Sequence, residues 1–435
     1  MEKDIAPPRF VKATKPLKLG TLLFLASLAL YTGYSELSAA RAPPSITQHC
    51  AHLDPIAATE FQARQDALAK QLAELNASAY IAEPGASSQF YGNFSSSDWR
   101  LSERPLLLVI TPERIGQNVK AKISILTPAF EADRSKTLPV ASKNVTFIEW
   151  AEEASPYTHA LSILSISPGT VFVDGQTRTF IVDGLREAHP RGTVSSAPYE
   201  IKRLRERKSP AELELLKCAN EAALLSIRAV HKQLQFGIRE STASAMLSAA
   251  LASAGLKNGG CLTLFGPNAA LPHGSGTDRA LRKNDFALFD CTGSLHGYQS
   301  DVTRTVALPG SKIPAEHLHI WHSVHAAQDV AIRTAREGVV AAEVDKAARL
   351  SLQNSTYFTH RLGHGIGLEV HEDPYLNGGS KAVLEIGHAF SDEPGIYILG
   401  KVGIRLEDCF YIHQNGSAVF LTGGVGGQAR SPWNP

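Results

Sequence analysis

The sequence has little cysteine and little excess charge, and both shortages exclude classes of protein. Its 435 residues include only five cysteines, an odd number without a C-x-x-C pair. This spacing excludes a zinc knuckle or a disulfide framework, although one or two disulfides that the sequence cannot pair remain compatible with it. With 43 Lys and Arg residues against 42 Asp and Glu residues, the chain has no basic field for nucleic acid and no acidic tail.

The sequence also lacks internal repeats of solenoid length and low-complexity tracts. A chain of 435 residues is too long for one ordinary core and predicts two domains. Apolar runs alternate with polar segments, as strands and helices do in an α/β protein. We therefore expect an α/β (α+β) fold with a first domain over residues 51–200 and a second domain over residues 201–435.

Charge is absent from residues 19–34, a run of 16 mostly apolar residues. Residues 1–18 before it carry five basic and two acidic side chains, which predicts that this end stays cytoplasmic. The length of the run lies between that of a signal-peptide core and that of a full membrane span. We favour an uncleaved signal anchor, and the alternative is a signal peptide cleaved near residues 38–40.

Both interpretations of the N-terminus place the rest of the chain in the secretory pathway. The protein would be a single-pass membrane protein with its folded part lumenal or extracellular, or it would be secreted. Residues 35–50 would form a polar spacer. Sequons for N-linked glycans agree with this placement and predict a glycoprotein; they occur at Asn76, Asn93, Asn144, Asn354 and Asn415.

The spacing of apolar residues predicts several helices. An amphipathic helix is expected from about residue 57, and further helices are expected near residues 240–255 and 314–337. Residues 200–235 form a highly charged helical stretch. Within it, Ser209–Glu212 combines an N-cap serine, a proline at the first helical position and an acid in the first turn. We interpret this start as the hinge into the second domain.

Two β-rich segments each bring a pair of carboxylates together. In residues 285–308, two strand-like runs flank a turn that we centre on Leu295–His296. Asp290 and Asp301 would then face each other across the hairpin, with Cβ atoms roughly 5 Å apart. Two unpaired carboxylates at this distance repel each other, and a divalent cation would remove that cost.

The second carboxylate pair lies in residues 389–412. A hairpin centred on Gly400 would place Glu393 opposite Glu407. A single acidic pair is more often a solvated surface, but the apolar neighbours of both pairs indicate burial, and buried carboxylates must be paired or bind metal. Four hard oxygen ligands suit Mn, Co, Fe or Zn ions in a bridged pair roughly 3.5–4 Å apart.

Histidines supply the remaining candidate ligands. The glycine-rich segment HRLGHGIGLEVHE contains His360, His364 and His371, and its glycines allow close approach of the backbone. We expect His364 to be the nitrogen ligand of the metal pair. A further histidine, His273, lies in LPHGSGT shortly before the first hairpin.

These motifs together resemble a known family. The segments LPHG, FDCTGSLHGYQSDVTRT, GHGIGLEVHE, EPGIY and GIRLED resemble the aminopeptidase P / prolidase (Xaa-Pro peptidase) family, which has the pita-bread fold. The resemblance is close over about residues 206–425. The first domain resembles more loosely the family's creatinase-type N-terminal domain.

The resemblance implies a role for each candidate residue. Asp301 and Glu407 would bridge two metal ions, and Glu393 would also act as general base. His273 and His371 would stabilise the oxyanion or protonate the leaving nitrogen, and both would contact substrate. The full metal-ligand set would be Asp290, Asp301, His364, Glu393 and Glu407.

Other residues would act around the metal ions. His360 would line the pocket for proline. Tyr397 and Arg405 would support the substrate-binding region, and Thr303 would orient Asp301. One departure from the family stands beside the ligands: Asp392 replaces a residue that is usually apolar. Because it points to the opposite strand face, we expect little effect on metal binding.

The resemblance also implies the reaction. The chain would be a metallo-aminopeptidase that holds two divalent ions, with Mn favoured and Co, Zn or Fe as alternatives. It would remove the N-terminal residue from peptides with proline at the second position, and it would form a homodimer. The alternatives are an Xaa-Pro dipeptidase, a creatinase-type hydrolase, a dimethylsulfoniopropionate lyase and a non-catalytic peptide-binding module.

Overall fold

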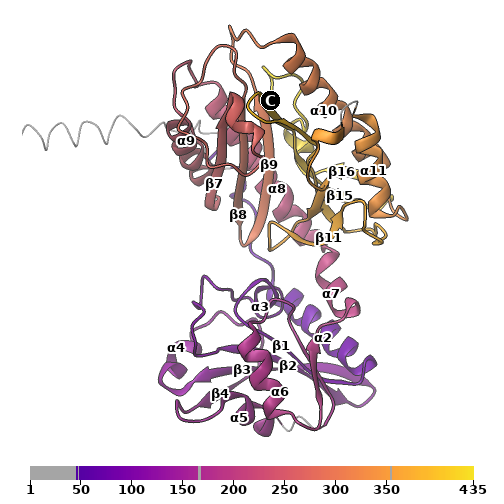
Figure 1. The fold of residues 1–435 in the computed structure, drawn as a ribbon. Coiled ribbons are helices and arrows are strands. Elements are labelled where there is room, and N and C mark those ends of the chain that lie inside the picture. Colours follow the sequence, from indigo (N-terminus) through magenta and orange to yellow (C-terminus); the bar gives the residue numbers. More distant parts are fainter. Residues whose placement is uncertain (1–45, 48, 165–167, 353–354) are drawn as a thin grey trace, which may run out of the picture. The chain divides into compact units, whose positions relative to one another are not determined.

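The computed structural model describes residues 46–47, 49–164, 168–352 and 355–435 (Figure 1). The chain divides into two units after Arg41, and all described residues belong to the second, Ala42–Pro435. The predicted targeting segment, residues 19–34, lies outside the described residues.

The first part of the second unit is built on a six-stranded mixed sheet with the order β4-β3-β2-β1-β5-β6. β1 is antiparallel to β2 and parallel to β5. The helix expected from about residue 57 is α2 (Ala58–Glu74), which packs on β1, β2 and β3. The strands are β1 (Ala77–Ala82), β2 (Leu107–Ile115), β3 (Asn118–Pro128), β4 (Val145–Trp150), β5 (Thr170–Val173) and β6 (Thr193–Ser196), and the other helices are α3 (Ala86–Gly92), η1 (Ala129–Glu131), α4 (Ala132–Ser135), α5 (Pro156–Ile163), α6 (Thr179–Ala188) and α7 (Tyr199–Glu206).

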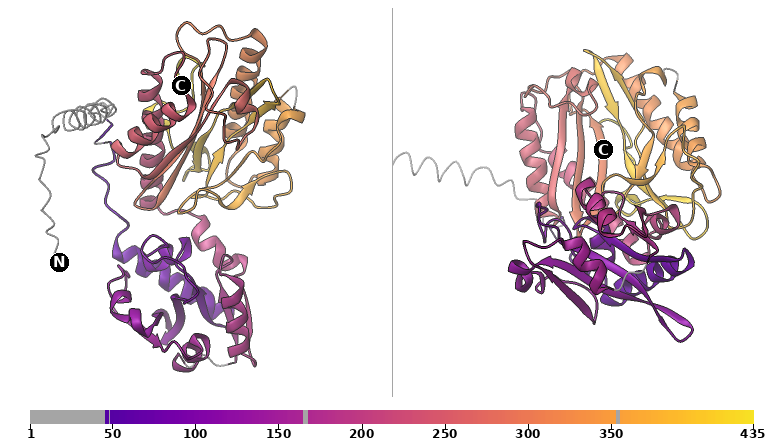
Figure 2. Two further views of the ribbon diagram at one scale, coloured as in Figure 1. Left: turned by 60° about the vertical axis from the view of Figure 1, so that its left-hand side comes forward. Right: turned by 60° about the horizontal axis from the view of Figure 1, so that its bottom comes forward.

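The second part places strands between two pairs of helices (Figures 1 and 2). α8 (Pro210–His231) and α9 (Glu240–Ser253) pack on a three-stranded sheet, β7-β8-β9. α10 (Ala315–Thr334) and α11 (Ala341–Ser351) pack against the remaining strands. These strands form a five-stranded sheet, β11-β10-β12-β15-β16, and the pair β13-β14.

The strands of the second part range from three to nine residues in length. Their bounds are β7 (Lys257–Phe265), β8 (Ala287–Leu295), β9 (Tyr298–Val306), β10 (Gly363–Gly365), β11 (Glu372–Leu376), β12 (Ala389–Asp392), β13 (Gly395–Ile398), β14 (Val402–Arg405), β15 (Asp408–Ile412) and β16 (Ala418–Phe420). Single 3-10 turns lie at η2 (Gly266–Ala270), η3 (Ser355–Tyr357) and η4 (Gly423–Val425). The mixed helix and strand content confirms the predicted α/β class. The division into domains 51–200 and 201–435 stays a prediction.

The charged stretch at residues 200–235 forms two helices, because Ser209 caps a new helix start. Its hydroxyl accepts a hydrogen bond from the Glu212 N–H over 3.2 Å, and the Glu212 carboxylate accepts one from the Ser209 N–H over 2.9 Å. This capping box satisfies two donors that a helix end otherwise leaves unpaired, and such a cap contributes about 1 kcal/mol. The predicted cap is confirmed, and it fixes the start of α8.

The first predicted hairpin is present, but its register differs from the prediction. β8 and β9 pair with Leu295 opposite Tyr298, so the turn residues are His296 and Gly297. Both have positive φ, 49° and 90°, as a two-residue type I′ turn requires. The predicted centre one residue earlier was wrong because it would have left Gly297, which best tolerates positive φ, outside the turn.

The shift changes which residues face the two aspartates. Asp290 lies opposite Thr303, and Asp301 lies opposite Thr292. The aspartates are therefore diagonal neighbours on one face of the hairpin rather than directly opposed. The second predicted register is confirmed, since Asp392 pairs with Asp408.

The five cysteines resolve into two disulfides and one buried thiol. Cys50 is bonded to Cys218, and Cys261 is bonded to Cys291 across β7 and β8. Cys409 is free and fully buried. Sequence spacing could not have paired these residues, because Cys50 and Cys218 are 168 positions apart.

The predicted membrane-anchored glycoprotein of the secretory pathway is wrong. In the part of the chain that the structure describes, no helix is long and apolar enough to cross a bilayer. The predicted glycan site Asn93 has its amide nitrogen engaged, since Nδ2 donates to the Pro139 carbonyl over 3.0 Å.

Candidate metal centre and active site

The five predicted metal ligands come from separate strands and meet at one place. Asp290 lies on β8, Asp301 on β9 and His364 on β10, whereas Glu393 follows β12 and Glu407 precedes β15. Their ligand atoms form overlapping groups in which all atoms lie within 4.8 Å of one another. These groups are Asp290–Asp301–Glu407, His364–Glu393–Glu407 and Asp301–His364–His371.

The two glutamates face each other in a gap between two strand ladders. β12 pairs with β15 as far as Asp392 and Asp408, and β13 pairs with β14 from Gly395 and Arg405 onward. Pro394 carries no N–H for a ladder bond, and it follows Glu393 directly. The interruption leaves both carboxylates free to turn toward Asp301.

Burial makes this carboxylate cluster electrostatically costly by itself. Asp301 is 5% exposed and Glu407 is 2% exposed. Burial, followed by the charge of Glu407, raises the pKa of the Asp301 carboxyl well above its usual value. Burial and the charge of Glu393 do the same to the pKa of Glu407. Divalent cations would offset this repulsion, so the donor set fits a pair of metal ions.

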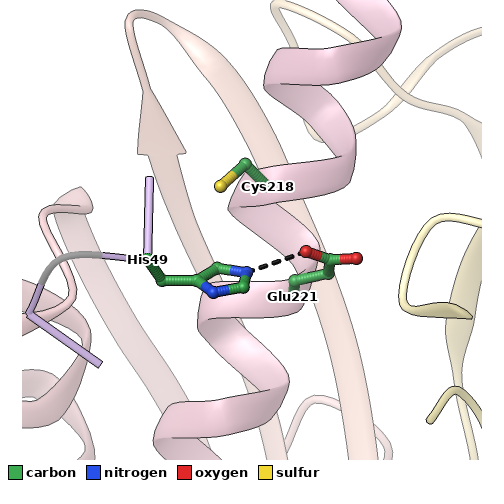
Figure 3. A group of neighbouring side chains, drawn as sticks. All are labelled: His49, Cys218 and Glu221. Atoms are coloured by element: carbon green, nitrogen blue, oxygen red, sulfur yellow. Dashed lines mark hydrogen bonds and ion pairs between the residues drawn. The ribbon is translucent and has the colours of Figure 1, made fainter. Parts of the chain in front are cut away.

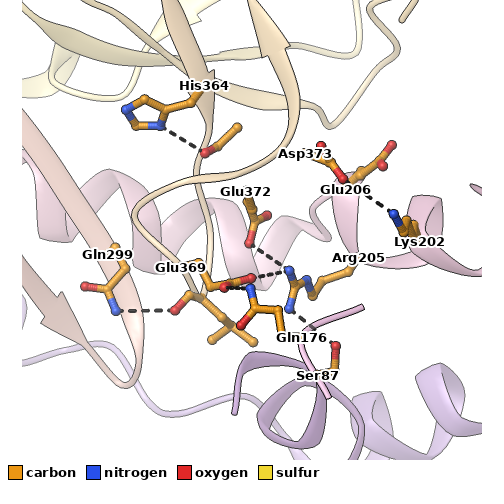
Figure 4. Close-up of polar contacts among 12 residues, drawn as sticks. Ser87, Gln176, Lys202, Arg205, Glu206, Gln299, His364, Glu369, Glu372 and Asp373 are labelled. Carbon is orange, nitrogen blue, oxygen red and sulfur yellow. Dashed lines mark hydrogen bonds and ion pairs between the residues drawn. The ribbon is translucent and has the colours of Figure 1, made fainter. Parts of the chain in front are cut away.

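His364 directs one ring nitrogen at the carboxylates. Its Nε2 lies 3.3 Å from Glu393 Oε1 and 3.5 Å from Asp301 Oδ2. Its Nδ1 lies 3.1 Å from the Gly365 carbonyl oxygen (Figure 4). A proton on Nδ1 would donate to that carbonyl and leave the Nε2 lone pair for a metal ion.

Thr303 and Arg405 brace the acidic residues. The Thr303 hydroxyl donates to Glu407 Oε2 over 2.6 Å, so the prediction that it orients Asp301 is corrected. Arg405 is 2% exposed, and its Nη2 donates to Asp290 Oδ2 over 2.6 Å. Its Nη1 donates to the Tyr397 hydroxyl over 3.0 Å. Through these two hydrogen bonds, Arg405 positions the Asp290 carboxylate and the Tyr397 hydroxyl.

His360 belongs to the same chain of contacts. Its Nε2 lies 2.8 Å from the Tyr397 hydroxyl and its Nδ1 lies 2.7 Å from the Arg361 carbonyl oxygen. Burial lowers the pKa of His360, which favours the neutral ring. Burial also raises the pKa of Tyr397 to about 12, against the opposing charge of Arg405. His360 and Tyr397 thus form a neutral hydrogen-bonded pair beside the charged centre.

His371 and His273 are the accessible histidines of the group. The rings of His371 and His364 lie 4.2 Å apart at 73°. Partial burial and then the neighbouring His364 lower the pKa of His371 to about 4. His273 is exposed in the loop before β8, and its charge contributes to lowering the pKa of both His360 and His371.

Two residues of the site escaped sequence reasoning. Asn220 on α8 is fully buried, and its Oδ1 accepts a hydrogen bond from the Asp301 N–H over 3.1 Å. The Ser391 hydroxyl accepts from the His364 N–H over 3.1 Å and donates to Glu393 Oε1 over 3.3 Å. Asn220 carries no local signal of this role, whereas Ser391 stands two residues before a candidate ligand.

Asp392 is wholly buried next to Glu393. It lies opposite Asp408 in the ladder, and neither of its carboxylate oxygens has a hydrogen-bond partner among the described residues. Burial and the charge of Asp408 raise its pKa well above the usual value. Asp408 is compensated by a fully buried ion pair with Arg304 over 2.8 Å.

A cavity of about 320 Å³ lies beside His371 and is lined by residues of both sheet-containing parts. Arg205 crosses it and points toward Glu369, Glu372 and Ser87 (Figure 4). Desolvation raises the pKa of Glu206 in its wall to about 7. His371 also lines this cavity, which therefore gives the candidate centre an adjoining space.

Comparison with known proteins agrees with this geometry. A family model described as Metallopeptidase family M24 matches residues 214–414. An uncharacterized peptidase of Schizosaccharomyces pombe is 36% identical over 385 residues, which cover 86% of this chain and 83% of the relative. The probable dipeptidase PepE of Mycobacterium tuberculosis is 31% identical over 312 residues, which cover 68% and 79%. The Xaa-Pro dipeptidase of Lactobacillus helveticus is 37% identical over 265 residues, which cover 57% and 71%.

Solved structures share the fold. The dipeptidase PepE from Mycobacterium ulcerans has a TM-score of 0.75 at 28% identity, with 85% of this chain and 97% of that chain covered. A variant of Escherichia coli aminopeptidase P has a TM-score of 0.70 at 17% identity, with 87% and 97% covered, and an identity this low shows the fold alone. The predicted family resemblance and fold are confirmed. The relatives' names describe peptidases.

Proposed function

Because the chain belongs to metallopeptidase family M24, and is therefore an enzyme that hydrolyses peptides, we propose that it cleaves the bond preceding proline. The observation that carries this proposal is that five buried or half-buried donors, four carboxylates and one imidazole, form overlapping groups of neighbouring ligand atoms. Asp290, Asp301, His364, Glu393 and Glu407 would hold two divalent ions. When bound, the ions would lower the pKa of water toward neutrality and polarise the scissile carbonyl.

Glu393 is the proposed general base. Its Oε1 lies within 3.3 Å of both the Ser391 hydroxyl and His364 Nε2. Although burial alone would raise the pKa of Glu393, the hydrogen bond and charge of His364 outweigh it and lower the pKa. An ionised Glu393 would accept a proton from the attacking water and pass it to the leaving nitrogen.

His371 and His273 are the proposed donors to the oxyanion. Since the pKa of His371 is about 4, its ring is neutral near pH 7 and can donate one N–H to developing negative charge. His360 and Tyr397 would shape the neighbouring pocket for the proline ring. Arg405 would hold Asp290 in place and would not contact substrate directly, because its nitrogens already have partners.

The preferred substrate that we propose is the Xaa-Pro dipeptide. Arg361 follows His360 directly, its guanidinium stacks 4.5 Å from the Tyr375 ring, and its charge contributes to lowering the pKa of His371. Within the described residues it makes no ion pair. A free guanidinium near the catalytic histidines suits the C-terminal carboxylate of a dipeptide. The names of the relatives PepE and Xaa-Pro dipeptidase support the same choice.

The second candidate is the Xaa-Pro aminopeptidase expected from the sequence, which differs in accepting longer peptides. A panel of Xaa-Pro dipeptides and Xaa-Pro-Yaa tripeptides, assayed with Mn, Co, Zn and Fe, separates the two. Faster cleavage of dipeptides supports the dipeptidase, and faster cleavage of tripeptides supports the aminopeptidase. Absence of proline-bond cleavage with every metal would overturn both and favour a creatinase-type hydrolase, a lyase or a binding module. The metal identity and the homodimer stay predictions.

A further inference from the structure

A second group of metal-ligating side chains lies where the segment around His49 meets α8. His49 and Cys50 are neighbours in the chain near the start of the second unit. Cys218 and Glu221 lie three positions apart on α8, so they share one helix face. The ligand atoms of His49, Cys218 and Glu221 all lie within 4.8 Å of one another (Figure 3).

These residues are already connected in pairs. Cys50 and Cys218 form a disulfide, and His49 Nε2 lies 2.7 Å from Glu221 Oε2. The two links join the same two segments side by side. The disulfide adds the Cys50 sulfur atom to the thiol position, imidazole and carboxylate of the group. In the disulfide neither sulfur is a thiolate, which is the form that binds metal.

The group is sheltered from solvent. Cys50 and Cys218 are each 5% exposed, and Glu221 is 6% exposed. Glu221 Oε1 has no hydrogen-bond partner within the described part of the chain. A Cβ atom on Gly424 would lie 2.2 Å from this oxygen, so only glycine leaves room for the carboxylate. A buried carboxylate with one unpartnered oxygen is costly unless a positive charge lies beside it.

We propose that the reduced form of this group is a Zn²⁺ site with the ligands Cys50, Cys218, His49 and Glu221. Two thiolates, an imidazole and a carboxylate are the ligand types that structural zinc sites use, and four of them complete a tetrahedral shell. His49 and Cys50 come from one segment, and Cys218 and Glu221 come from α8. The contact between His49 and Glu221 links the two segments before a metal ion binds. A preformed group of this kind loses little conformational freedom on binding.

The change from disulfide to zinc site needs a reductant, which is a dithiol. The dithiol transfers two electrons and two protons to the Cys50–Cys218 bond, giving two thiols, and becomes a cyclic disulfide itself. Zn²⁺ then binds the two sulfurs as both thiols lose their protons to solvent. The same two segments are thus linked by a covalent bond under oxidising conditions and by a metal ion under reducing conditions.

The second disulfide provides an internal contrast. Cys261 and Cys291 face each other across β7 and β8, but no metal-donor group among the described residues includes either of them. Reduction of that bond should create two thiols without a metal site. The proposed zinc-binding property is therefore specific to the Cys50–Cys218 pair.

The test uses Co²⁺ as a spectroscopic substitute for Zn²⁺ in the full chain. The protein, loaded with Mn²⁺, is reduced with dithiothreitol, freed of reductant without oxygen and titrated with Co²⁺. Thiolate bound to Co²⁺ gives a charge-transfer band that the carboxylate and imidazole ligands of the active site cannot give. We expect one such Co²⁺ per chain in the reduced protein, displacement by Zn²⁺ and no band in the oxidised protein.

Variants make the assignment specific. His49→Ala and Glu221→Gln, which leave both thiols in place, should weaken Co²⁺ binding at least tenfold. Cys218→Ser should abolish the band, and the matched control Cys261→Ser should leave it unchanged. The proposal is overturned if the reduced chain shows no band, if Cys50–Cys218 resists excess dithiol, or if both His49→Ala and Glu221→Gln bind Co²⁺ as tightly as the unaltered chain.

Discussion

The Thr303 hydroxyl donates a hydrogen bond of 2.6 Å to Glu407 Oε2. The same oxygen of Thr303 accepts a hydrogen bond from Arg405 Nε over 3.2 Å. One buried hydroxyl therefore links a proposed bridging ligand to the arginine that holds Asp290. Such supporting contacts fix the orientation of metal ligands.

Replacing Thr303 with valine should weaken metal binding without removing a ligand. Valine keeps the shape but loses both hydrogen bonds, and changes of this kind lower metal affinity about ten- to a hundredfold. The concentration of Mn²⁺ needed for half-maximal activity measures the effect. Thr303→Ser, which retains the hydroxyl, is the control. Equal Mn²⁺ requirements in Thr303→Val and the unaltered chain would show that the hydrogen bond to Glu407 is unimportant.

Glu393→Gln should lower kcat at least a hundredfold, because general-base catalysis contributes about 10²- to 10⁴-fold and this residue is also a proposed ligand. The amide preserves size and cannot accept the proton from water. Circular dichroism should show an unchanged fold, and metal content should be measured alongside activity. A variant that retained near-normal kcat would remove Glu393 from the mechanism.

Arg361→Gln should raise KM for Xaa-Pro dipeptides more than KM for the corresponding C-terminal amides. A charge-assisted hydrogen bond contributes about 1.5–3 kcal/mol, so losing it should raise KM for Xaa-Pro roughly tenfold or more. The uncharged Xaa-Pro amide should be little affected, and Arg361→Lys should recover part of the loss. If both substrates respond equally to Arg361→Gln, the guanidinium does not recognise the carboxylate.

His388 should make the protein lose stability as pH falls. It is 1% exposed, and burial followed by the charges of Lys208 and Arg207 lowers its pKa to about 3. In the unfolded chain the His388 side chain titrates near pH 6.5. Between about pH 6.5 and pH 3, the unfolded chain therefore binds a proton at His388 that the folded chain does not bind. Neutral His388 therefore makes its full contribution to the free energy of unfolding above about pH 6.5. Below that pH, the free energy of unfolding falls by up to about 1.4 kcal/mol per pH unit.

Denaturant unfolding at several pH values measures this slope. His388→Asn can still accept the hydrogen bond from the Glu385 N–H, because its Oδ1 takes the place of Nδ1, but it cannot be protonated. The variant should therefore lose less stability on acidification than the unaltered chain. Parallel slopes for the two proteins would contradict the neutral state of buried His388.

Much of the candidate site could be predicted from the sequence because its ligands lie in strands with strong local patterns. The register around Gly400 was correct, so Glu393 and Glu407 were correctly placed opposite each other. The predicted register of the hairpin around His296 was displaced. The sequences of the two flanking strands are compatible with several turn centres, and only the positive φ at Gly297 selects one of them. The two registers share the same alternation, so the face carrying Asp290 and Asp301 was unaffected.

The remaining features depend on contacts between distant segments, which local patterns do not encode. Asn220 reaches Asp301 because α8 packs on β9. Cys50 meets Cys218 although the two lie 168 positions apart in the chain. The predicted placement in the membrane rested on apolarity and a basic flank at residues 19–34, which lie outside the described residues.

A titration of the metal-free, disulfide-bonded chain with Mn²⁺ tests the central claim most directly. Bound metal and cleavage of an Xaa-Pro dipeptide are measured in the same samples. We expect cleavage to rise with occupancy and to saturate when two ions are bound per chain, with His364→Ala shifted to higher Mn²⁺ concentration. Full cleavage by the metal-free chain, or saturation with fewer than one ion bound per chain, would contradict the proposed two-metal peptidase.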